Sequence, residues 1–542
     1  MTFRRLAVVL AIVLIPSPCL AFSTPDLPLT DPVYRNIDKL VAADLIQAVI
    51  VGQRPYSRMQ IAEILLQAKT TIERKAPGFP AAEPLAGTLQ AILATMNKRF
   101  APEMRVLSEG GEPFLFSCHP IEEARLSYEY SSGGEARFTP NNGLGGLDGA
   151  RIDPFAYYRQ GISLGHGSRL VADLSSSLRV TPYLSLWAEP RVETPFASGS
   201  DSNVRLLQIY GRLKMGNTAF TVGRRSLLWG QGEYSGLQLT ENAFPLDSVE
   251  LSNDIPMLLP SVLSLLGPVK SSFLYADMGG SYKKHPGAYL VGLRVSMQPH
   301  PNFEFGVSNL VIGGGEGAPA ASLRERAQDV FSFSTRKPLS NRIGGFDARL
   351  RLPSLRGTTI YGEMAFDDPN ANLKVLFGDE TAYLFGLYCP IVDPAGRLSL
   401  RAEYHRTGLR FYRHGQFPAV RKGDVLGDPL GPDAQAGYLT AIYDLTDSLA
   451  LRLDLAAEFR GSDSYAVIDP QGNFHKRVTR RGPLERRYRL VAGVRYRPVS
   501  GLGIEGVLGC EQTANFGFRA GYDPCGVYSR LGLDYSFEYG SN

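Results

Sequence analysis

Long apolar runs and closely spaced cysteines are scarce in this chain of 542 residues. The apolar run Leu6–Ile15 is too short for a membrane helix, which needs roughly 20 such residues. Another candidate, Met257–Val269, is short and interrupted by Pro260 and Pro268. If the chain lies in a membrane, it must cross as a closed β-barrel, because only helices and closed barrels satisfy the backbone in lipid.

Signs of catalysis and of nucleic-acid binding are also lacking. No GxSxG, HExxH, Walker A or Rossmann fingerprint occurs in a fitting context, and His405 and His414 have no Ser or Asp partner fixed by spacing. Lys and Arg number 57 against 53 acidic residues, so no basic excess points to a nucleic acid. We therefore expect no enzyme, no cofactor and no nucleic-acid partner.

The five cysteines include no CxxC pair, so we expect no metal site. Cys510 and Cys525 lie on consecutive predicted strands around a short loop. A cross-strand disulfide between them is one possibility in an oxidising compartment, and the sequence leaves it open.

The first 21 residues resemble a cleaved secretory signal. Arg4 and Arg5 form a basic start, an apolar run follows, and Cys19 to Ala21 supply small residues before the expected cleavage site. This pattern predicts an exported protein.

Residues 22–105 are predicted to form a small helical bundle. Pro32 is suited to a first helical turn after Asp31, and Ser57 to Gln60 resemble a capping box. A third helix is expected at residues 82–100. These helices are too polar to cross a membrane, and we expect them on the periplasmic side, against or inside a barrel mouth.

Residues 106–542 are predicted to form the barrel, because their apolar residues recur with period two. In the closing stretch 529–539, Leu531, Leu533 and Tyr535 share one face, while Arg530 and Asp534 share the other. Similar charged faces recur along the chain and suggest a lumen filled with water, since a sandwich core could not hold so many charges unpaired.

Short turns alternate with long polar loops, as in outer-membrane barrels. The turns are expected near residues 181, 214, 298, 353, 392, 446 and 499. Treating 153–180 as one bulged strand and placing a strand near 234–242 gives 18 antiparallel strands. Arg224, Arg225 and Trp229 either re-enter the barrel or end an ordinary strand, and Trp187 is expected in the aromatic girdle facing lipid.

Several ordered sequence blocks resemble the capsule assembly protein Wzi family. They include Asp31–Tyr34, Gly52–Arg58, Gly223–Gly232, Glu403–Gly408 and Gly427–Asp433. The resemblance implies an 18-stranded outer-membrane barrel with a periplasmic helical bundle, whose family role is that of a lectin holding capsular polysaccharide on the cell surface. It transfers no ligand residue position by position.

Within residues 404–436, basic and aromatic side chains suited to an acidic glycan gather. Aromatic rings stack on sugars, and guanidinium groups pair with carboxylates. The predicted glycan-binding residues are Arg406, Arg410, Tyr412, Arg413, His414, Arg421 and Lys422.

The alternative is a solvated loop whose basic residues bind lipopolysaccharide phosphates or have no ligand. A second basic cluster, Lys476, Arg477, Arg480, Arg481, Arg486 and Arg487, has the same two interpretations.

The leading hypothesis is a non-enzymatic outer-membrane lectin that attaches capsular or other surface polysaccharide to the cell. Its expected partners are that polysaccharide, outer-membrane lipid and lipopolysaccharide, and the barrel insertion machinery, whose closing-strand signal resembles Arg530 to Phe537. The alternative is a porin for anionic solutes, favoured by basic lumen faces such as that of Arg487 and Arg489.

Overall fold

The computed structural model describes residues 22–75, 84–109, 116–133, 136–138, 147, 150–152, 155, 160–162, 164–196, 201–282, 284–331, 339–368, 380–462, 464–468, 471, 474–478 and 482–537. The predicted signal segment, Arg480, Arg481 and the last residues of the closing stretch lie outside these ranges, as do the side chains of Lys476 and Arg477. Among the described residues, no helix is both long and apolar enough to span a membrane.

In the described residues before the barrel there are four helices: α2 (Val33–Ala42), α3 (Arg58–Lys75), α4 (Pro84–Arg99) and α5 (Ala101–Glu109). The Asp31 carboxylate accepts the Val33 N–H at 2.9 Å, and the Ser57 hydroxyl accepts the Gln60 N–H at 3.1 Å, so both predicted helix starts are confirmed. The helical part runs on to Glu109, past the limit of 105 expected from the sequence.

The described strands form a closed antiparallel barrel of 18 full strands, with the short strand β11 (Met257–Leu258) added beside β12. Each strand pairs with its neighbour in sequence, and β2 closes the barrel by pairing with both β5 and β27. The full strands are β2 (Ser117–Ser131), β5 (Gly167–Thr181), β6 (Leu184–Pro195), β7 (Asn203–Met215), β8 (Thr218–Arg225), β10 (Leu246–Asn253), β12 (Pro268–Asp277), β13 (Tyr289–His300), β14 (Phe303–Gly313), β15 (Ser340–Leu352), β16 (Thr358–Asp367), β17 (Thr381–Cys389), β18 (Leu398–Thr407), β21 (Ala434–Asp444), β22 (Leu449–Arg460), β25 (Glu485–Val499), β26 (Leu502–Ala514) and β27 (Cys525–Ser536).

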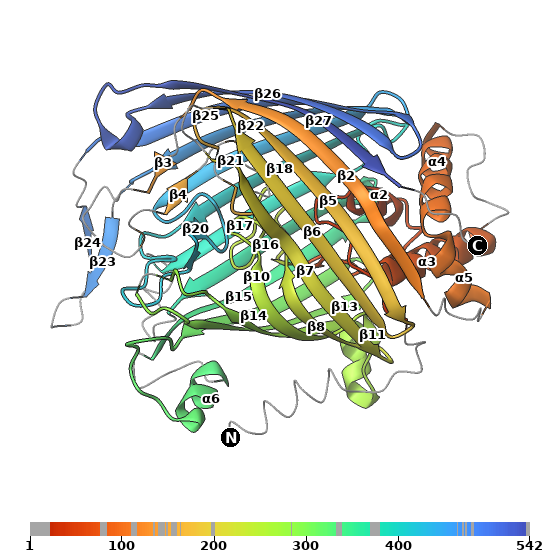
Figure 1. The fold of residues 1–542 in the computed structure, drawn as a ribbon, viewed down its shortest axis with the longest axis horizontal. Helices are drawn as coiled ribbons and strands as arrows, with labels where there is room; N and C mark the ends of the chain where they lie inside the picture. Colours follow the sequence, from red (N-terminus) through yellow and green to blue (C-terminus); the bar gives the residue numbers. More distant parts are fainter. Residues whose placement is uncertain are drawn as a thin grey trace.

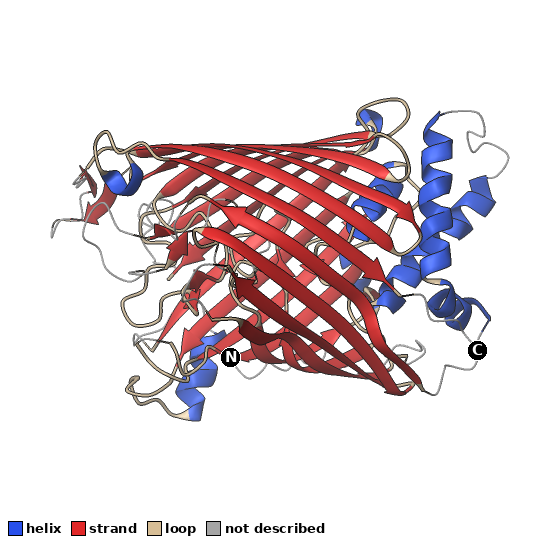
Figure 2. Cartoon of the chain, turned by 45° about the horizontal axis from the view of Figure 1, so that its top comes forward, coloured by secondary structure: helices blue, strands red, loops and turns tan. Residues whose placement is uncertain are grey.

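The two ends of the barrel differ, as Figures 1 and 2 show. Helices α2 to α5 gather at one end with the short turns, and the long loops emerge at the other. Contacts fix this arrangement: the Lys39 ammonium of α2 donates to the Gly396 carbonyl in the β17–β18 turn at 2.7 Å, and Thr88 of α4 donates to Ala395 at 2.7 Å. In outer-membrane barrels the short-turn end is periplasmic.

The period-two prediction is confirmed in β27. Leu531 and Leu533 are exposed on the outer wall, whereas Arg530 points inward and donates to Glu505 at 2.7 Å. The inward charges, however, are largely ion-paired rather than simply hydrated. Arg489, for example, forms ion pairs with Glu458 at 2.9 Å and with Glu511 at 3.0 Å. Acidic partners, and not water alone, therefore compensate its charge inside the barrel.

Three details differ from the sequence-based predictions, and the disulfide that the sequence left open does not form. Strand β5 begins only at Gly167, and no strand forms at 234–242, where the chain instead turns into the lumen. Trp187 is buried and lines a cavity inside the barrel rather than facing lipid, because its position on β6 has the inward parity. Cys510 lies opposite Val527, two residues out of register with Cys525, and both thiols are free.

Candidate functional site

The segment 226–245, between β8 and β10, folds into the barrel lumen. It contains the short strand β9 (Leu228–Trp229), which pairs with β1 (Gln53–Arg54) from the N-terminal segment. Trp229 is fully buried there. Of the two interpretations left open for Arg224 to Trp229, re-entry into the barrel is therefore the correct one.

Three carboxylates on the inner wall hold these inserted segments by their backbone N–H groups. Glu304 of β14 accepts from Val51 and Gly52 at 2.9 and 2.8 Å. Glu363 of β16 accepts from Gln231, Gly232 and Leu237 at 2.6 to 3.0 Å, and Glu403 of β18 accepts from Glu233 and Tyr234 at 2.8 and 3.1 Å. These seven hydrogen bonds fix the inserted backbone to alternate strands of the wall.

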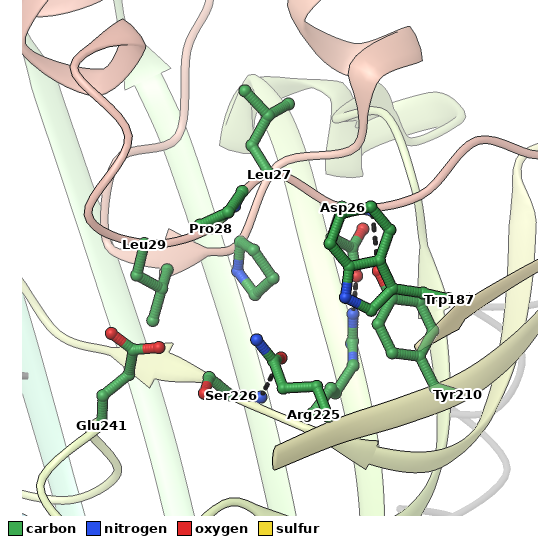
Figure 3. Close-up of a pocket in the computed structure, with 11 residues that line it drawn as sticks. Asp26, Leu27, Pro28, Leu29, Trp187, Tyr210, Arg225, Ser226 and Glu241 are labelled. Atoms are coloured by element: carbon green, nitrogen blue, oxygen red, sulfur yellow. Dashed lines mark hydrogen bonds and ion pairs between the residues drawn. The ribbon is translucent and has the colours of Figure 1, made fainter. Parts of the chain in front are cut away.

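The N-terminal segment is attached to the wall strands β7 and β8, next to the start of the insertion. Figure 3 shows Asp26 beside Tyr210 and Arg225, with Trp187 and Glu241 lining the same narrow cavity. The Asp26 carboxylate accepts from both Arg212 and Arg225. Burial raises the pKa of the Glu241 carboxyl to about 7. Since Asp26 already binds both guanidinium groups, we interpret this cavity as a seam between the barrel wall and the segments inserted into the lumen, which we call the plug.

Loop 408–433, which follows β18, closes over the inserted segment from the outer end. The Tyr412 hydroxyl donates to the Leu237 carbonyl at 2.5 Å and accepts from the Asp428 N–H at 2.8 Å. Phe411, Phe417 and Leu426 join one buried cluster with Leu237, Leu239 and inward residues of β10 to β17. This side of the lumen is therefore packed and apolar, and the expectation of a lumen filled with water is wrong there.

The seven predicted glycan-binding residues separate into several environments. Arg406 has outward parity on β18, and its guanidinium lies 5.4 Å from the Tyr383 ring centre. Tyr412 and Arg421 are buried, and Arg413 is half-buried, 5.5 Å from the Phe138 ring. Arg410 and His414 form weak ion pairs with Glu380 at 3.7 Å and Asp368 at 3.4 Å. Lys422 is exposed.

Tyr412 cannot stack on a sugar from its position in the plug core, so that assignment is wrong. His414 is half-buried too, and this burial lowers the pKa of its imidazole. Period-two parity assigns Arg406 to the outer wall, which sequence reasoning overlooked because Arg406 adjoins the loop.

The structure brings Arg421 and Lys422 together with residues that we had not predicted. Arg421 and Arg224 both bind the single carboxylate of Asp247, each at 2.8 Å, and the Lys422 ammonium lies 3.9 Å from the centre of the Phe244 ring. We call Arg224, Asp247, Arg421 and Lys422 the rim cluster. The hairpin of β19 (Val420–Arg421) and β20 (Asp424–Val425) brings Arg421 and Lys422 to the outer ends of β8 and β10.

Positive charge exceeds negative charge in the rim cluster. Partial burial lowers the pKa of the Lys422 amine, and the neighbouring guanidinium groups of Arg421 and Arg224 lower it further. A like charge disfavours protonation, so an arriving anion would relieve this repulsion. Alternation shows only that Arg224 shares a strand face with Val222, and Asp247 with Val249. The register that makes Arg224 and Asp247 neighbours and the reach of the hairpin are both long-range features, which alternation does not reveal.

Within the residues that the structure describes, no group of three or more His, Cys, Asp or Glu side chains is arranged to hold a metal ion. Plug, paired wall and cationic rim together define an obstructed outer-membrane-type barrel with a cluster of cations at its outer mouth.

Comparison with known proteins identifies the family. The model of the capsule assembly protein Wzi family matches residues 137–523, so the chain belongs to this family and is an outer-membrane β-barrel. A solved structure of Wzi from Escherichia coli, described as an outer-membrane carbohydrate-binding β-barrel involved in group 1 capsule assembly, aligns with 94% of this chain and 99% of its own at a TM-score of 0.63 and 17% identity. At that identity the likeness concerns the fold.

Two further similarities are weaker. An uncharacterised 55.8 kDa protein in the cps region of Klebsiella pneumoniae is 26% identical over 175 residues, which span 30% of this chain and 34% of that protein. The chain thus matches about a third of the length of this curated relative. OprD of Pseudomonas aeruginosa aligns with 79% of this chain and 96% of its own, at 9% identity and a TM-score of 0.45.

Proposed function

We propose that this protein is a non-enzymatic surface lectin that holds an acidic polysaccharide, capsular or similar, on the outer membrane during capsule assembly. The observation that carries the proposal is the rim cluster at the outer mouth, where three cations gather near one carboxylate: Arg224 and Arg421 bind Asp247, and Lys422 lies over the Phe244 ring beside them. The family role and the carbohydrate binding described for the Wzi structure support the same conclusion.

The chemistry of the rim suits a chain of uronate or pyruvate-bearing sugars. Lys422 offers an exposed ammonium, and Arg421 and Arg224 hold guanidinium groups in place through Asp247. Guanidinium forks bind carboxylates bidentately, and their preorganisation reduces the entropy lost on binding. Arg410, only loosely paired with Glu380 at 3.7 Å, is a second contact along the polymer.

Two other partners follow from position. Arg406, on the outer wall near the long-loop end, is suited to phosphates of outer-membrane lipid or lipopolysaccharide. The alternating closing strand, with Tyr535 and Phe537 exposed, is suited to recognition by the barrel insertion machinery after signal cleavage.

An anion channel is less well supported than a lectin, because the inserted segments occupy the lumen side bounded by β10 to β17 and most lumen arginines have acidic partners. Some space remains opposite, where Arg452 and Arg495 are 42% and 38% exposed.

Deletion of the gene in the host distinguishes the two functions. A lectin role predicts unchanged polymer synthesis, with the polymer shed into the medium and restored to cells by the parent gene. Unchanged cell-bound polysaccharide in the deletion strain would refute the role.

A further inference from the structure

The connection between β10 and β12 carries an unusual apolar appendage. It runs from Asp254 to Gly267 at the short-turn end and contains β11 and the 3₁₀-helix η1 (Ser261–Leu266). From Ile255 to Val269 it has no charged residue. Figure 1 shows η1 as the yellow-green coil projecting from the wall beside β11. We call β11 and η1 together the wall hook.

The wall hook lies on the outside of the barrel. Met257 and Leu259 are buried against Val269 of β12, and Leu266, Val295 and Met297 pack against the same cluster. Val295 and Met297 have outward parity on β13, since their neighbours Arg294 and Ser296 are buried on the lumen side. The hook therefore covers lipid-facing side chains, and its position is fixed from below by the strand wall.

Its remaining apolar side chains point away from the protein. Val262 is 77% exposed, Leu265 75%, Leu258 65% and Leu263 47%. No side chain in η1 is buried. Four large apolar groups on so short a segment form a patch that water would disfavour, and such patches mark an interaction site.

The other external helix behaves differently. Helix α6 (Leu323–Phe331) packs on the same wall near its long-loop end, where Val330 covers Val291 and Val311. Arg342 of the wall pairs with Asp329 of α6 at 2.8 Å. Among the described side chains of α6, the exposed ones are Arg324, Ala327 and Gln328, and none of these is a large apolar group. The described part of α6 thus lacks the large apolar exposure of the wall hook.

We propose that the wall hook inserts into the membrane leaflet at the short-turn end and anchors this sector of the barrel in phospholipid acyl chains. The hook is continuous with the apolar wall below it, carries no charge that would have to be dehydrated, and projects sideways from the strands. Apolar segments lying in an interface bind in proportion to the apolar area that they bury.

Bromine-labelled lipid tests the insertion directly. The full-length protein with Leu265→Trp is reconstituted into phosphatidylcholine vesicles with plain or brominated acyl chains, and the emission of the parent, which reports Trp187 and Trp229, is subtracted. Gln90→Trp, on the exposed face of α4, is the matched control. If the first variant does not fold, Val262→Trp replaces it at an equally exposed position.

Insertion predicts that brominated chains quench more than half of the added emission of Leu265→Trp and leave that of Gln90→Trp unchanged. Added emission that is equal in both lipids would overturn the proposal. In that case a blue-shifted spectrum would indicate that a second copy of this chain covers the hook, and a red-shifted spectrum would indicate that water surrounds it.

Discussion

The Glu403 carboxylate on β18 accepts a hydrogen bond of 2.8 Å from the backbone N–H of Glu233, which lies 170 positions earlier in the chain. Glu363, two strands away, holds Gln231 and Gly232 in the same manner. The wall thus binds the inserted segment mainly through its backbone.

Removing these acceptors should loosen the plug. Glu363→Ala leaves three buried N–H groups without their acceptor, and each unsatisfied group costs about 1–3 kcal/mol. We expect lower thermal stability and irregular conductance in planar bilayers, where the parent protein stays silent. Glu505→Ala, which faces the other side of the lumen beside Arg495 and Arg530, should stay silent. A Glu363→Ala protein that shows no conductance and the thermal stability of the parent would contradict the plug assignment.

Asp26 should be a strong contributor to the docking of the N-terminal segment. Asp26→Asn leaves Arg225 and Arg212 buried with one fewer carboxylate, and breaking a buried pair on one side typically costs about 3–5 kcal/mol. Unfolding in urea should shift to lower concentration, and protease should cut residues 22–57 faster. Asp201→Asn, at an exposed position, provides the comparison, and equal behaviour of the two variants would argue against this docking.

Glu63 on α3 should make the helical bundle sensitive to pH. Burial, with Asp254 nearby, raises the pKa of its carboxyl from 4.5 to about 7. The folded chain thus keeps a proton that the unfolded chain releases, so stability falls as the pH rises from about 4.5 through 7. Glu63→Gln should be more stable than the parent near pH 8, on the order of 2 kcal/mol, with the difference fading near pH 4.

The measurement is thermal unfolding of both proteins across that pH range. Glu73→Gln, exposed on the same helix, should follow the parent at every pH. A parent curve that is flat between pH 4 and 8 would contradict the burial of Glu63.

Cys510 and Cys525 should react as free thiols, because neighbouring strands place them opposite Val527 and Gln512. Denaturing the protein without reductant and adding a maleimide reagent should label both cysteines, as mass spectrometry of the peptides would show. Peptides joined until reductant is added would refute the register.

Sequence reasoning predicted the barrel well because alternation is a local signal. The faces of Arg530 and Leu531 follow from period two, and the capping of α3 follows from Ser57 and Gln60. The pairing of inward charges across strands was not predicted, since it depends on register. Water was invoked for Arg489, whereas Glu458 and Glu511 neutralise it.

The candidate site was only half predictable. Lys422 and Arg421 were among the predicted glycan-binding residues and lie in the rim cluster. Tyr412 was predicted to stack on a sugar, because no local pattern indicates that loop 408–433 folds inward. Tyr412 is held inside by its hydrogen bond to Leu237, 175 positions away. Contacts between residues so far apart produce no periodic pattern in the sequence. Arg224 and Asp247 became part of the site for the same reason.

Binding of the purified protein to its host's own surface polysaccharide tests the central claim most directly. It should be measured at low and high salt, with the carboxyl-reduced polymer as a neutral probe. We expect saturable binding that weakens with salt, is lost with the reduced polymer, and falls about fivefold in Lys422→Ala but not in Arg105→Ala, on the exposed face of α5. Equal binding by all three proteins, or none to the acidic polymer, would contradict the assignment of the rim cluster.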